Sequence, residues 1–163
     1  MILAIDPGPE SSGLVLYDEA ARRVVEAHAA MTLTDVLAAI RVAGVSALPP
    51  YADGNPVVAI ERMQSYGIAG ASLLDTARIA GRMEQRAHDF GLLVVLLYRR
   101  DILRALDVTG QGSRDALVRQ RLLEMHPGGT GTAKAPGPLR GTSGHAWAAL
   151  AVAVAAGLGA RSE

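Results

Sequence analysis

The sequence predicts a mixed α/β fold in which a five-stranded sheet is flanked by helices. Two observations support this prediction. Short apolar runs bounded by turn residues, such as Ile2–Asp6 and residues 57–61, are typical of buried strands. Between such runs, apolar residues recur at helical spacing, as in residues 70–89. Strands that alternate with helices in the second half of the chain indicate helices layered on a partly parallel sheet.

Five segments are predicted to be strands because they are short, largely apolar and bounded by turn residues. A Gly/Pro/Ser turn joins the first two, which return on each other as a hairpin. The third is more polar and fits a sheet edge, whereas the fifth is entirely apolar and is expected at the sheet centre. The predicted strands are residues 2–6, 13–17, 22–28, 57–61 and 92–98.

Five further segments are predicted to be helices from their apolar spacing or alanine content. Thr34 is the expected N-cap of the first helix, and Ser113 caps the fourth with Asp115 in its first turn. The last helix is nearly all Ala, Leu and Val with one Trp, so it must lie against the sheet. The predicted helices are residues 34–48, 70–89, 99–106, 113–125 and 144–157.

Composition limits the possible classes of protein. A chain of 163 residues that is 50% hydrophobic suits one compact domain. The absence of cysteine excludes disulfides and thiolate metal sites. The N-terminus lacks a signal-peptide pattern, and the apolar run at 147–158 is too short to cross a bilayer, so we expect a soluble cytoplasmic protein with no membrane partner.

The basic residues are unusual in type, because Lys134 is the only lysine and all the others are arginine. A high-GC coding bias explains this pattern without any function. Arginine also recognises phosphates in a bidentate manner. The formal net charge of zero does not exclude nucleic acid, because a local basic face is sufficient.

Two of the predicted strands end in a carboxylate. Asp6 ends the first strand and Glu61 ends the fourth. Two apolar strands that deliver an acid at the same relative position indicate convergence at the sheet rim, where α/β proteins place their chemistry. The alternatives are that Asp6 only starts a turn and that Glu61 only pairs with Arg62.

Five segments, in this order along the chain, carry a resemblance to a known family. They are Ile5-Asp6-Pro7-Gly8 with Ile60-Glu61, Ser65-Tyr66-Gly67 with Leu74-Asp75-Thr76, Gly112-Ser113-Arg114-Asp115-Ala116 with Arg119-Gln120, Pro136-Gly137-Pro138-Leu139, and His145-Ala146-Trp147-Ala148-Ala149-Leu150-Ala151-Val152. Together they resemble RuvC-type Holliday junction resolvases of the RNase H-like superfamily, especially the short phage and prophage branch. The resemblance covers nearly the whole chain.

The resemblance implies that residues 1–163 form a single RNase H-like nuclease domain. It implies a crossover junction endodeoxyribonuclease of DNA recombination and repair, which works as a homodimer on branched DNA. Two Mg²⁺ or Mn²⁺ ions per site are implied, with Asp6 and Glu61 as ligands. This agrees with the chemistry, because Mg²⁺ takes oxygen ligands and two such ions activate water and stabilise the leaving oxygen.

The last helix departs from the family pattern. Most relatives have acids there, whereas this chain has His145 and, three residues later, Ala148. His145 is a metal ligand that suits Mn²⁺, a general base, or a cation that holds the scissile phosphate. A capping or partly buried histidine is the alternative. Asp75 is a candidate for the missing acid, although an ordinary pairing with Arg78 also explains it.

The remaining candidates concern DNA. Arg114, Arg119, Lys134 and Arg140 are expected to contact phosphates, and Tyr66 to stack on an unpaired base. Each is also compatible with an ordinary surface role.

The helix predicted at 70–90 is the candidate dimer interface, because symmetric cleavage of two strands needs two sites related by a two-fold axis. Its arginines at 78, 82 and 86 share one face, which is a solvated face, a subunit surface or a nucleic-acid surface. Two other functions stay open: a junction-binding protein with reduced catalysis, and an RNase H-like nuclease acting on flaps or hybrids.

Overall fold

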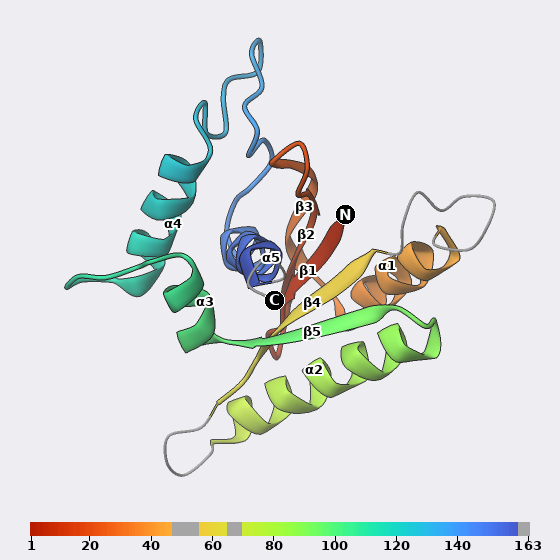
Figure 1. The fold of residues 1–163 in the computed structure, drawn as a ribbon. Helices are drawn as coiled ribbons and strands as arrows, with labels where there is room; N and C mark the ends of the chain where they lie inside the picture. The colour runs from red at the N-terminus through yellow and green to blue at the C-terminus, as the bar shows by residue number, and fades with distance from the viewer. Residues whose placement is uncertain (47–55, 65–69, 160–163) are drawn as a thin grey trace.

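The computed structural model describes residues 1–46, 56–64 and 70–159. The strands are β1 (Ile2–Asp6), β2 (Ser12–Asp18), β3 (Arg23–Met31), β4 (Val57–Arg62) and β5 (Leu93–Tyr98). The helices are α1 (Leu33–Ser46), α2 (Ala71–Asp89), α3 (Arg99–Ala105), α4 (Arg114–Met125) and α5 (Ala146–Gly159). The sheet lies between two helical layers, with α3, α4 and α5 on one side and α1 and α2 on the other (Figure 1). The predicted five-stranded mixed sheet flanked by helices is confirmed.

The strands are arranged in the order β3-β2-β1-β4-β5. β1, β2 and β3 pair antiparallel, as their hairpins require, whereas β1, β4 and β5 pair parallel. In the parallel part, Ile5 lies opposite Ile60, and Ile60 lies opposite Leu96. Because parallel strands need crossover connections, α1 and α2 carry the chain back across one face of the sheet. The carboxyl ends of three neighbouring strands therefore meet at one edge.

Alternation along the strands divides the core into two parts, because successive side chains point to opposite faces. Ala4 of β1 and Ala59 of β4 pack beneath α5. Ile5 and Ile60 pack on the other side, against α1 and α2, and neither is exposed to solvent. Full burial of one such side chain contributes about 1.5–3 kcal/mol relative to exposure.

Helix α5 is apolar on all sides, which requires burial. Residues 149–157 are all buried, and the helix lies against β1 and β2, as predicted. Alanine has the highest helix propensity and lets the helix approach the sheet closely. In the described part of the chain, no helix has both the length and the apolar character needed to cross a membrane.

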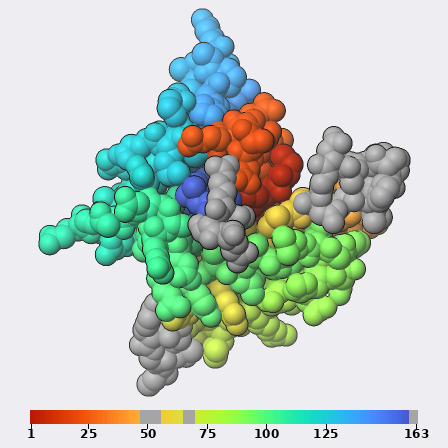
Figure 2. Space-filling view, in the orientation of Figure 1, coloured from red at the N-terminus to blue at the C-terminus, as the bar shows by residue number. Residues whose placement is uncertain are grey.

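The connection between α4 and α5 extends away from the body of the molecule, as the light-blue segment at the top of the space-filling view shows (Figure 2). It is still tied to the sheet. The backbone nitrogen of Val24 donates a hydrogen bond of 2.7 Å to the Pro138 carbonyl, and Leu139 is fully buried.

Two details of the prediction were wrong. Strand β5 is an edge strand rather than a central one, and Leu93 is 61% exposed. Its apolar character comes from helices that cover it, since α2 and α3 both contact it. The N-terminus of α1 is capped by Thr32 rather than Thr34, because the Asp35 backbone nitrogen donates to Thr32 Oγ1 at 3.3 Å.

Candidate active site

Asp6 and Glu61 lie side by side at the carboxyl edge of the sheet. Each is the next residue after a paired position, Ile5 on β1 and Ile60 on β4. Because side chains alternate, both carboxylates point to the α5 side of the sheet. They line a cavity of about 290 Å³. Its lining residues are Asp6, Glu61, Arg99, Asp115, Val118, Gly144, His145, Trp147 and Ala148.

Both carboxylates are partly or fully withdrawn from water. Glu61 is only 6% exposed. Burial first, and then repulsion from Asp6, raises the pKa of Glu61 to about 7. Burial also raises the pKa of Asp6, although His145 and Arg99 oppose the increase. Two acids that are withdrawn from water and repel each other are costly to ionise, and a bound cation would offset that cost.

His145 reaches this edge because of a glycine. His145 immediately precedes α5, and its carbonyl accepts a 3.2 Å hydrogen bond from the Ala149 nitrogen. Its backbone lies directly on Gly13, the residue of β2 paired with Asp6, and a Cβ on Gly13 would come within 2.3 Å of the His145 carbonyl oxygen. This close approach places His145 Nδ1 at 3.5 Å from Asp6 Oδ2. A glycine inside a strand often marks such an approach of another backbone.

Arg99 and Asp115 are site residues that the sequence analysis did not assign. Arg99 follows β5 directly, and its Nη1 lies 3.8 Å from Glu61 Oε2. Its Nη2 bonds to Asp115 Oδ1. The sequence contained a signal for Arg99, because it follows β5 directly, as Asp6 and Glu61 stand at the ends of β1 and β4. Asp115 was expected only in the first turn of the helix that Ser113 begins, and its place in the cavity depends on where α4 packs.

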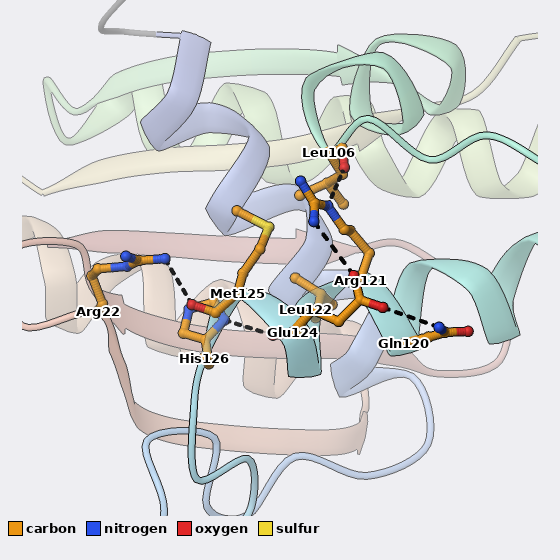
Figure 3. A network of polar contacts seen from close by, with 8 residues as sticks. All are labelled: Arg22, Leu106, Gln120, Arg121, Leu122, Glu124, Met125 and His126. Atoms are coloured by element: carbon orange, nitrogen blue, oxygen red, sulfur yellow. Dashed lines mark hydrogen bonds and ion pairs between the residues drawn. The ribbon is translucent and has the colours of Figure 1, made fainter.

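The last part of α4 is fixed to the rest of the fold, which determines where its first turn lies. Arg121 Nε donates a 2.9 Å hydrogen bond to the Leu106 carbonyl after α3, and Arg22 reaches the carbonyl of the last residue of α4 (Figure 3). His126, which follows the helix, is buried and lies 2.8 Å from the Tyr17 hydroxyl of β2. These contacts reach the residue after α3, the turn between β2 and β3, and β2 itself, and they hold the helix beside α5.

Two further predictions about acids can be compared with this geometry. Asp75 lies exposed on α2 and does not line the cavity. Ala148 does line it, so the position where the resemblance led us to expect an acid presents a methyl group to the cavity. Asp115 is the acid that the structure brings there instead.

The predicted DNA-contacting residues occupy different places. Arg114 begins α4 and donates a 3.3 Å hydrogen bond to the Gly110 carbonyl, while Arg119 lies exposed one turn further on. Lys134 and Arg140 are exposed on the α4–α5 connection. Tyr66 falls outside the described residues.

A second basic group lies at the ends of β4 and β5, and the sequence analysis did not identify it. Arg62 and Arg100 both stack on the ring of Tyr98, at 5.5 and 5.2 Å from its centroid. Arg62 is the last residue of β4, directly after Glu61, and Arg100 follows Arg99 in the first turn of α3, so both lie at the sheet edge that carries the cavity.

The donor chemistry of the cavity fits a divalent cation such as Mg²⁺ or Mn²⁺. Within the described ranges, no three His, Cys, Asp or Glu side chains are grouped closely enough to bind a metal ion as they stand. Mg²⁺ does not require such a cage, because it usually binds one or two carboxylates and completes its shell with water and substrate phosphates. Asp6 and Glu61 provide that pair, with pKa values raised by burial.

Comparison with known structures identifies the fold. The sequence matches no protein-family model and no curated protein. The structure of T. thermophilus RuvC in complex with a Holliday junction substrate matches 99% of this chain and 94% of its own, with a TM-score of 0.63 and 19% identity. A second Thermus thermophilus RuvC structure matches 99% and 95%, with a TM-score of 0.60 and 20% identity. The chain therefore has the RNase H-like fold of RuvC, which confirms the predicted resemblance at the level of the fold. The phage or prophage branch stays a prediction.

Proposed function

We propose that this protein is a metal-dependent, structure-specific DNA endonuclease that resolves four-way junctions. The observation that carries the proposal is the pair of carboxylates, a buried Glu61 and a partly buried Asp6, on neighbouring parallel strands and facing one cavity. The RuvC fold supports it, since one matched structure holds a Holliday junction substrate.

In this proposal Asp6 and Glu61 hold one or two Mg²⁺ or Mn²⁺ ions. Bound there, the ions would activate a water and stabilise the leaving oxygen of a phosphodiester. The protein supplies two preorganised oxygen donors at the edge of a rigid sheet. Their raised pKa values favour metal binding over the metal-free ionised state, because a cation offsets the repulsion between them.

His145 and Arg99 act on the substrate side of the cavity. His145 Nδ1 lies 3.5 Å from Asp6 Oδ2, from where the ring accepts a proton from water or, when protonated, holds the scissile phosphate. Arg99 lies beside Glu61 and presents a planar set of donors suited to phosphate oxygens. It also limits the negative charge of the cavity before DNA arrives.

The junction arms are bound by basic residues around this edge. Arg114 and Arg119 on α4, with Lys134 and Arg140 on the connection to α5, contact phosphates on one side. Arg62 and Arg100, stacked on Tyr98, extend the basic surface on the other side. Their stacking restricts the side chains, so less entropy is lost when they bind phosphate.

Paired cleavage requires two copies of the site, and we propose a homodimer. Helix α2 is the candidate interface because it exposes Leu74, which is 59% accessible, together with Arg78 and Arg82.

The test is cleavage of a labelled four-way junction in the presence of Mg²⁺ or Mn²⁺. Asp6→Asn and Glu61→Gln are expected to abolish product formation while junction binding persists. The exposed carboxylate Glu10 provides a control, since Glu10→Gln is expected to cleave at the wild-type rate. Cleavage at the wild-type rate by either active-site variant would reject the assignment of these two acids to the active site. Competition with flap and RNA–DNA hybrid substrates determines whether the four-way junction is the preferred substrate.

A second candidate is a junction-binding protein with reduced catalysis. The methyl group of Ala148 in the cavity favours it, because an acid is missing where most relatives have one. Tight binding of the junction with no product under either metal would support this candidate and reject the nuclease.

A further inference from the structure

A second hollow adjoins the cavity that holds the two carboxylates. It is an open groove of about 630 Å³, within the range of sites that hold small ligands. It shares Asp115, Gly144 and Trp147 with the cavity, so the two are continuous. Its other lining residues are Ala116, Arg119, Gln120, Leu123, Thr142 and Ser143.

The groove contains a cation stacked on an aromatic ring. The guanidinium carbon of Arg119 lies 4.9 Å from the centroid of the Trp147 ring. In the part of the chain that the structure describes, Arg119 forms no ion pair with an acid. A guanidinium that packs over an aromatic ring keeps N–H donors available for phosphate oxygens.

Two features prepare the groove for an anion. The only acid among its lining residues, Asp115, is paired with Arg99, so its charge is already offset. The helix that carries Arg119 is fixed at its far end by the Arg121–Leu106 hydrogen bond and by the buried His126. The Arg119 donors therefore point from a rigid element that does not have to be ordered when a ligand binds.

From this geometry we infer that the groove is a nucleotide subsite for the residue next to the scissile phosphate. Arg119 donates to the phosphate of that nucleotide, and Trp147 is a positioning residue that holds the guanidinium over its ring. The sugar and base lie along the groove against the exposed side chain of Leu123. The inference rests on the proposed function, because the neighbouring cavity must be the cleavage site.

Trp147 makes the subsite directly observable, since it is the only tryptophan in the chain. The experiment titrates a four-way DNA junction into the Asp6→Asn protein and follows tryptophan fluorescence. A nucleotide that enters the groove changes the surroundings of the indole, so a saturable change in emission is expected. The DNA concentration at half of the emission change should agree with the dissociation constant measured separately with labelled DNA.

Variants test the role of each partner in the same background. Arg119→Ala is expected to weaken junction binding about ten- to a hundredfold. It should also lower the slope of log affinity against log salt by about 0.9, the effect of one phosphate contact. Arg41→Ala, which removes an exposed arginine from α1 in the opposite helical layer, should change neither.

The tryptophan itself is tested with two substitutions. Trp147→Phe keeps a ring under the guanidinium and should retain affinity within about threefold, whereas Trp147→Ala should lose as much affinity as Arg119→Ala. A double variant should then lose little more than either single variant, because both remove the same contact. Thermal unfolding of each variant separates this loss from loss of fold.

The outcomes separate the subsite from the function on which it rests. If wild-type protein cleaves the junction but emission does not respond and Arg119→Ala keeps the full salt slope, the subsite is rejected and the nuclease stands. If wild-type protein neither binds nor cleaves branched DNA, both proposals are rejected.

Discussion

Glu61 gives a quantitative test of the site in the absence of metal. Its ordinary pKa of 4.5 is raised to about 7 in the folded protein, chiefly because the side chain is buried. Between these two pH values the folded chain holds more protons than the unfolded chain, so stability falls as pH rises through the interval. At about 1.4 kcal/mol per pH unit, the full loss above pH 7 is about 3 kcal/mol.

Glu61→Gln removes this loss because glutamine does not ionise. With metal removed by a chelator, we expect the variant to be more stable than wild type by about 3 kcal/mol at pH 8, and no more stable at pH 4. For a chain of this size the difference at pH 8 corresponds to a rise of about 6–12 °C in Tm. Thermal or urea unfolding followed by circular dichroism at a series of pH values measures it. Glu10→Gln, at an exposed site, is the matched control.

The pH dependence also indicates what the buried charge does. Saturating Mg²⁺ should stabilise wild type more than Glu61→Gln, because it binds the folded protein through this carboxylate. Equal stability of the metal-free wild type and variant across the whole pH series would refute the reasoning that Glu61 is a buried acid without a sufficient partner.

Gly13, Asp115 and Leu74 provide further tests of how the site is assembled. Gly13→Ala should push away the backbone that precedes α5 and reduce cleavage about a hundredfold. Gly159→Ala, at the last residue of α5, where a Cβ meets open space, should leave the rate unchanged. Asp115→Asn should weaken Mn²⁺ binding measured by calorimetry, and Asp75→Asn should not, because of these two acids only Asp115 lines the cavity. A larger loss of Mn²⁺ affinity in Asp75→Asn than in Asp115→Asn would favour Asp75 as the missing acid. Leu74→Glu places a charge on the exposed face of α2 and should shift sedimentation from dimer to monomer; an unchanged dimer would mean that the interface lies elsewhere.

The sequence contained enough information for the sheet and for the two strand-end acids. Apolar runs of five to seven residues mark strands wherever both faces are covered, and the side-chain period then places Asp6 and Glu61 on the same face. The same rule misplaced β5, because hydrophobicity reports whether helices cover the faces of a strand and not whether another strand pairs with its edge.

What the sequence did not show is the placement of α4 relative to the sheet. Asp115 stands three residues from the end of a Gly-rich turn, where an acid ordinarily serves the helix dipole. It lines the cavity only because the other end of its helix is held by contacts from α3 and β2. Arg119 and Trp147 likewise come together across 28 positions of sequence, and no local pattern links them.

The parallel pairing of β1 with β4 has a consequence for the order in which this protein is made. Asp6 is synthesised before β4, and its carboxylate is not joined by that of Glu61 until β4 has been made and has closed the long loop that contains β2, β3 and α1. Pairing across such a separation forms slowly, because the entropy of loop closure is lost before any contact compensates for it. We therefore expect nascent and partly folded chains to hold no paired carboxylates, so that the proposed cleavage of DNA becomes possible only when the sheet is complete.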